Sequence, residues 1–160
     1  DYRLIILQYG VNVANPAVRD YTFYERAMTR VVDRLQKACP GASILIIGMS
    51  DKGYRYEGEY ITDPSVPRLL AAQRRLAERN HVAFWNLFEA MGGENSMVGW
   101  VENKPTMANK DYTHVNARGA RKIGQLLSQY LLQEYQKSAG GPAAPAAPQA
   151  DGDTAAQASR

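Results

Sequence analysis

The chain has 160 residues, of which 45% are hydrophobic and 22% are charged, and its formal net charge at neutral pH is +3. This is the composition of a globular domain, and no apolar run is long enough to span a bilayer. The 19 basic residues are scattered over the expected helical faces and do not cluster with aromatic residues, which argues against a nucleic-acid-binding protein.

The single cysteine, Cys39, excludes an internal disulfide bond and a metal site built from several cysteines. It stands before Pro40-Gly41, a pair that ends helices, so we interpret it as a small apolar residue near a helix end. Neither a metal nor another cofactor is expected. The chain starts at Asp1 without a Met or a recognisable signal peptide, which indicates that a segment has been removed upstream.

The first predicted element is a strand. Leu4-Ile5-Ile6-Leu7 is a continuous apolar run, which is typical of a strand buried on both faces of a parallel sheet. The loop 10–16 follows it and is rich in turn formers, at the edge where open α/β sheets bind ligands. Apolar residues then recur at helical spacing from about 18 to 38, which predicts a crossover helix.

A second buried strand is predicted over 43–48, and Ser50 and Asp51 follow its carboxyl end. We expect a long polar loop from there to Asp63. The sequence Asp63-Pro64-Ser65 has the capping chemistry of a helix start, and this helix is expected to end near Asn80.

The third strand is predicted over 81–87. The stretch 88–109 contains Gly92-Gly93 and Pro105 but little periodicity, which predicts a long functional or mobile loop. A last helix is expected from about 117 to 135. The Ala, Pro, Gly and Gln composition of 139–160 predicts a disordered tail after a single domain at 1–138.

Strands that alternate with helices predict a three-layer α/β fold with a parallel sheet and right-handed crossovers. Three strands make a small parallel sheet with an open edge. We therefore expect further strands upstream of Asp1.

Three groups of polar residues are expected at the carboxyl edge of this sheet. They are Gly10-x-Asn12, Ser50-Asp51 and Asp111-x-x-His114. A neutral imidazole can take a proton from a hydroxyl when a carboxylate bonded to its other nitrogen holds it in the right tautomer. Asp111 is a candidate for that carboxylate and His114 for that base, although the spacing alone is a weak signal.

In their order and spacing these groups resemble the SGNH hydrolase family, also called GDSL-like esterases, over residues from about 4 to 135. The resemblance implies the flavodoxin-like α/β/α architecture of that family. It also implies that Asn12 donates to the oxyanion, that His114 is the general base and that Asp111 orients it. Ser50 is interpreted as a loop or substrate-binding residue.

The segment 84–93, followed by Ser96-Met97, is similar to a branch of this family found in secreted bacterial carbohydrate and peptidoglycan esterases. This implies a serine esterase that removes a small acyl group, with acetyl expected, from a carbohydrate or peptidoglycan-type substrate. The expected partner is then an acylated carbohydrate or another small ester, and the expected location is secreted or periplasmic.

The family's nucleophilic serine belongs to a Gly-Asp-Ser block, which these 160 residues lack. We therefore expect the chain to be the carboxyl-terminal portion of a longer hydrolase, inactive alone and associated with an upstream segment. That segment would carry the nucleophile and a second oxyanion donor.

Three alternatives remain open. Ser50 could be the nucleophile of a Gly-x-Ser-x-Gly elbow, but Lys52 replaces the second glycine. The chain could instead be a non-catalytic carbohydrate-binding or interaction domain on a hydrolase scaffold. A small flavodoxin-like binding module is a third interpretation, which no glycine-rich phosphate loop supports. The second histidine, His81, follows a predicted helix end and is interpreted as a helix cap.

Overall fold

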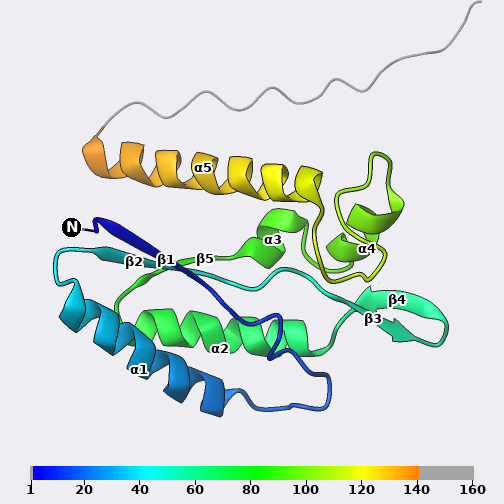
Figure 1. Cartoon of the computed structure of the whole chain (residues 1–160), viewed down its shortest axis with the longest axis horizontal. Helices are drawn as coiled ribbons and strands as arrows, with labels where there is room; N and C mark the ends of the chain where they lie inside the picture. The colour runs from blue at the N-terminus through cyan, green and yellow to red at the C-terminus, as the bar shows by residue number, and fades with distance from the viewer. Residues whose placement is uncertain (1, 141–160) are drawn as a thin grey trace, which may run out of the picture. The chain divides into compact units, whose positions relative to one another are not determined.

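The computed structural model describes residues 2–140 of the chain (Figure 1). In chain order its helices and strands are β1 (Leu4–Gln8), α1 (Thr22–Ala38), β2 (Ser43–Ile47), β3 (Gly53–Tyr56), β4 (Glu59–Thr62), α2 (Ser65–Arg79), β5 (Ala83–Trp85), α3 (Leu87–Met91), α4 (Ser96–Glu102) and α5 (Ala117–Ala139). The chain divides into two compact units, 1–126 and 127–160. The boundary falls within α5. The first unit contains all the other helices and strands and the first part of α5, and the described part of the second unit begins with the rest of that helix.

The three predicted strands form one parallel sheet in the order β1-β2-β5. β1 pairs with β2 from Leu4–Ser43 to Gln8–Ile47, and β2 pairs with β5 from Leu45 onward. β2 is buried along four of its five residues, as the apolar sequence of a central strand requires. The α/β class with a parallel sheet is therefore confirmed.

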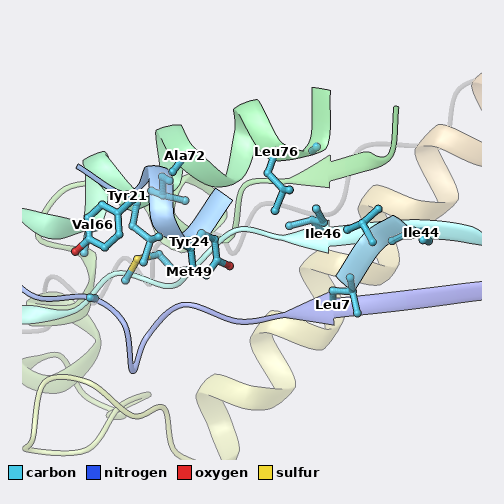
Figure 2. Packing of buried hydrophobic residues seen from close by; sticks show 14 residues of the cluster. Leu7, Tyr21, Tyr24, Ile44, Ile46, Met49, Val66, Ala72 and Leu76 are labelled. Carbon is cyan, nitrogen blue, oxygen red and sulfur yellow. The ribbon is translucent and has the colours of Figure 1, made fainter. Parts of the chain in front are cut away.

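The core of the first unit lies between the sheet and the helices α1 and α2, which pack against each other (Figure 1). Val32, Val66, Leu69 and Ala72 are fully buried there. Figure 2 shows the side chains of both helices meeting those of β2. The amphipathic spacing that predicted these helices is thus what builds the core.

β1 is an edge strand among the described residues, and only one of its faces is covered. Leu7 belongs to the core cluster and Ile5 packs against it, whereas Leu4 and Ile6 are 42% and 44% exposed. Successive side chains of a strand point to opposite faces, so the exposed pair lies on the face away from that core. The prediction that this strand is buried on both faces is wrong for this chain.

The predicted polar loop between Ser50 and Asp63 is in fact an antiparallel hairpin, β3–β4. Its two-residue turn is Glu57-Gly58, with φ values of 49° and 95°. Positive φ at both central residues is the geometry of the turns that join two-residue hairpins, and glycine favours it. The signal was present in the sequence, as aromatic and β-branched residues on both sides of Glu-Gly.

The long loop predicted over 88–109 contains the short helices α3 and α4. The side chain of Asn86 caps α3 by accepting a hydrogen bond from the N–H of Glu89, and Gly92 ends the helix with a φ of 120°. Helices of one or two turns are too short to show a periodicity in the sequence. Capping residues were therefore the only local signal.

At the other end of the sheet, α2 ends at Arg79 with Asn80 as its C-cap. His81 follows with a φ of 52°, and its N–H donates to the carbonyl of Glu78. This places His81 at a helix end. Of the predicted tail 139–160, Ala139 is the last residue of α5, and residues 141–160 lie outside the described part of the chain.

Candidate functional site

The Asp111 and His114 side chains are joined by a hydrogen bond. The Nδ1 atom of His114 lies 2.8 Å from the Oδ2 atom of Asp111. The other carboxylate oxygen, Oδ1, accepts hydrogen bonds from the backbone N–H groups of Thr113 and His114, both at 2.9 Å. The carboxylate thus closes a tight backbone turn over residues 111–114, and it also holds the imidazole through Nδ1. The Nε2 atom has no hydrogen-bond partner among the described residues and the side chain is 65% exposed.

The same hydrogen bonds determine the ionisation of the carboxyl group. The N–H of His114, then its ring and the N–H of Thr113 lower the pKa of Asp111 from 3.8 to about 2. Hydrogen bonds donated to a carboxylate favour its charged form. Asp111 is therefore ionised throughout the pH range in which an imidazole can act as a base.

We expect an NMR titration of the Asp111 carboxyl carbon to have its midpoint near pH 2. Because the folded pKa is lower than the ordinary one, these bonds stabilise the fold above about pH 4 and their contribution is lost as the pH falls through about 2. The midpoint should rise in His114→Ala, which loses the ring contact. A wild-type midpoint at the ordinary value of 3.8 would mean that the turn is not formed.

The segment that carries this pair is tied to the residues before it. Ala108 and Val115 form an isolated antiparallel bridge, and the N–H of Asn116 donates to the carbonyl of Met107 at 3.0 Å. The side-chain oxygen of Asn116 then accepts from the N–H groups of Arg118 and Gly119, as a helix-capping asparagine does. His114 therefore lies just before the first turn of α5, as predicted.

Asn12 and Ser50 both line a pocket of about 630 Å³ beyond the carboxyl ends of β1 and β2. Asn12 is exposed and Ser50 is half-buried. Most of the other lining is apolar and includes Phe23 and Met28 of α1. Within residues 2–140 no hydrogen bond joins Asn12 or Ser50 to Asp111 or His114. The structure thus brings the predicted residues together as two pairs.

Gly10 shapes the loop that carries Asn12. Its φ is 135°, and its carbonyl accepts from the N–H groups of Val13 and Ala14, so the chain turns back around Asn12. A Cβ atom on Gly10 would lie 2.9 Å from the Nε2 atom of Gln73. Both the backbone conformation and the available space therefore require glycine at this position.

Gln73 of α2 connects the ends of β1 and β2 and was not predicted from the sequence. It is fully buried, donates to the carbonyl of Tyr9 at 2.6 Å and accepts from the N–H of Met49 at 2.9 Å. It fixes the two residues from which the loops of Asn12 and Ser50 begin. A polar residue on the apolar face of a predicted helix was the available signal.

Replacing Gln73 with leucine should lower the free energy of unfolding by roughly 2–4 kcal/mol, since each buried polar group left without a partner costs about 1–3 kcal/mol. The groups that lose a partner are the N–H of Met49, the carbonyl of Tyr9 and the hydroxyl of Tyr24. Urea unfolding measures the change, and the matched control is Gln125→Leu at an exposed position of α5. Equal stability of the two variants would contradict the role given to Gln73.

Asp51, beside Ser50, contacts a different part of the fold. It is fully buried, and its Oδ2 atom accepts a 2.8 Å hydrogen bond from the N–H of Met97 at the beginning of α4. Burial is the largest influence on this carboxyl group and raises its pKa. Asp51 therefore attaches α4 to the end of β2, and within residues 2–140 no hydrogen bond joins its side chain to Asp111 or His114.

Within residues 2–140, no group of three or more His, Cys, Asp or Glu side chains is arranged to hold a metal ion. The helices in this range are all too short or too polar to cross a membrane.

A parallel-sheet α/β fold and a hydrogen-bonded Asp–His pair are features of hydrolases that use a serine nucleophile. A model of the GDSL-like lipase/acylhydrolase family matches residues 1–122 of this chain. The chain belongs to that family, whose members are also called SGNH hydrolases. A search of curated proteins finds no significant match.

Solved structures agree with this assignment. A peptidoglycan O-acetylesterase is 30% identical, with a TM-score of 0.75 over 84% of this chain and 38% of its own. An acetyl xylan esterase is 18% identical, with a TM-score of 0.61 over 80% of this chain and 66% of its own. A protein from Lactobacillus plantarum is 19% identical, with a TM-score of 0.63 over 82% of this chain and 67% of its own. The acetyl xylan esterase and the Lactobacillus plantarum protein show only that the fold is shared. This chain spans 38% of the length of the peptidoglycan O-acetylesterase.

Proposed function

We propose that this chain supplies the general base, its orienting carboxylate and one oxyanion donor of a serine esterase that removes acetyl groups from a carbohydrate of the peptidoglycan type. The observation that carries the proposal is the hydrogen bond between Asp111 and His114. An ionised carboxylate on Nδ1 keeps the proton there, which leaves Nε2 as the acceptor that a serine hydroxyl needs.

In the proposed reaction His114 takes the proton of a serine hydroxyl as the serine oxygen bonds to the acetyl carbonyl carbon. The tetrahedral intermediate collapses with cleavage of the bond to the sugar oxygen, which receives that proton from His114. Water then attacks the acetyl-serine with His114 again as base, and acetate and the free serine are released. Asp111 stays ionised and stabilises the imidazolium that forms in both halves.

Asn12 is the proposed oxyanion donor. Its side chain is exposed in the pocket beyond β1 and β2, and its loop is fixed by the turn at Gly10 and by Gln73. A donor held in place before the reaction stabilises the developing negative charge without the cost of reorienting a solvent dipole. The rigid support of this loop is what favours Asn12 over an ordinary turn residue.

We propose that the nucleophilic serine comes from a segment outside these 160 residues. The sequence contains no Gly-Asp-Ser block. The open edge of β1 and its exposed Leu4 and Ile6 offer backbone groups and apolar surface for another strand. Ser50 is the competing nucleophile within the chain, but no hydrogen bond joins it to His114 among the described residues.

The proposed substrate follows from the relatives. The peptidoglycan O-acetylesterase, at 30% identity, is the neighbour that supports an acetylated peptidoglycan. The complete protein is expected to release acetate from O-acetylated peptidoglycan, with O-acetylated xylan as the second substrate to try. Peptidoglycan whose O-acetyl groups have been removed by mild base is the control, because it keeps its N-acetyl groups. Binding of both peptidoglycans without acetate release would favour a non-catalytic carbohydrate-binding domain.

A further inference from the structure

Tyr112, which stands between Asp111 and His114, has a backbone conformation that few residues adopt. Its φ is 53°, in the left-handed region. For a bulky residue other than glycine this conformation is unfavourable, and it persists only where the surrounding structure enforces it. The turn that lets the Asp111 carboxylate reach both N–H groups and the imidazole passes through this residue.

Three other elements hold Tyr112. Its ring stacks on the ring of Tyr60 in β4, with centroids 3.6 Å apart and planes 6° from parallel. Its hydroxyl donates to Glu102 at the end of α4 at 3.0 Å, and its carbonyl accepts from the N–H of Gly53 in β3 at 2.6 Å. The side chain and the backbone of Tyr112 are therefore both held by contacts with other elements of the fold.

The approach of β3 to this residue requires glycine at position 53. A Cβ atom on Gly53 would lie 2.5 Å from the Cβ atom of Tyr112, closer than two such atoms can come. The hairpin is anchored at this same end on its second strand, because Thr62, which pairs with Gly53, and Asn95 exchange hydrogen bonds of 2.7 and 3.0 Å between side chain and backbone. The hairpin is thus a fixed support for Tyr112.

We propose that Tyr60 is a positioning residue for the Asp111–His114 pair, acting through its stack on Tyr112. The inference rests on the proposed function, because it assigns the hairpin a role in acyl transfer. Without the stack, Tyr112 relaxes out of the left-handed region. The N–H groups of Thr113 and His114 then turn away from the carboxylate, and the imidazole loses the partner that determines its tautomer.

The first test needs no substrate and uses the chain as it is. Long-range ¹H–¹⁵N NMR at alkaline pH should show the proton of His114 on Nδ1 in the wild type. We expect the same in Tyr60→Phe, which keeps the ring, and in Tyr56→Ala, a control 54% exposed on the same hairpin. In Tyr60→Ala the proton should move largely to Nε2, and the Asp111 carboxyl midpoint should rise from about 2 toward 3.8.

A Tyr60→Ala spectrum in which His114 keeps its Nδ1 proton and Asp111 its low midpoint would overturn the proposal. Tyr60 lies outside the core cluster, so this variant should fold. Tyr60→Leu, which keeps apolar bulk without a ring to stack, gives the same two readouts should the alanine variant lose its amide dispersion.

The second test is made in the complete enzyme. Tyr60→Ala should lower kcat roughly tenfold to a hundredfold with a much smaller change in KM, and it should add little further loss in an Asp111→Asn background. Full additivity with Asp111→Asn, or a change in KM alone, would contradict a positioning role. An inactive complete enzyme would refute the proposed function, while the NMR result would still decide the role of Tyr60.

Discussion

Replacing His114 with alanine in the complete enzyme should reduce kcat by roughly a thousandfold or more, because it removes the proposed general base. Asp111→Asn should cause comparable or smaller damage. The amide oxygen is uncharged and accepts more weakly than the carboxylate, and the amide NH2 group can instead donate to Nδ1, which favours the wrong tautomer of the imidazole. Steady-state kinetics with a chromogenic acetate ester measures both effects.

The matched control for this pair is His81→Ala, which removes the other histidine of the chain. His81 lies between the end of α2 and the start of β5, at the edge of the sheet opposite the carboxyl ends of its strands. We therefore expect kcat to stay close to the wild-type value. A defect in His81→Ala as deep as that of His114→Ala would mean that the reaction takes place at the other end of the sheet.

Replacing Asn12 with alanine should lower kcat on the order of a hundredfold or more and change KM much less, since the oxyanion hydrogen bond strengthens chiefly in the transition state. The control is Asn15→Ala in the same loop. The Asn15 side chain is exposed and, among the described residues, accepts only from the nearby N–H of Ala17 at 2.9 Å. A rise in KM with unchanged kcat would instead make Asn12 a substrate-binding residue, and equal losses in the two variants would point to the loop as a whole.

The sheet and the long helices could be predicted because their signals are local. The apolar run of β2 and the helical spacing in α1 and α2 each reflect a single environment, the core on which they pack. The hairpin β3–β4 was missed because its residues are half-buried or exposed and its charged turn resembles a loop. The exposure of β1 could not be predicted from its sequence, since it depends on which strands lie beside it.

The contacts of the candidate site also include some that are local in sequence and some that are remote. Asp111 and His114 are three residues apart, so a spacing in the sequence could indicate the contact that the structure contains. The supports of the site are remote in sequence. Gln73 reaches Tyr9 across 64 residues, and Tyr60 stacks on Tyr112 from another part of the chain. Such contacts depend on the register and packing of the whole fold, which a single sequence does not reveal.

The measurement that tests the central proposal most directly is to label the complete protein with a fluorophosphonate and to locate the modified serine by mass spectrometry. The proposal predicts one adduct, on a serine that precedes Asp1, with labelling strongly reduced in His114→Ala. It also predicts that the 160-residue chain alone remains unlabelled and does not hydrolyse p-nitrophenyl acetate above background. An adduct on Ser50, with turnover that disappears in Ser50→Ala, would contradict the proposal and make this chain a self-sufficient hydrolase.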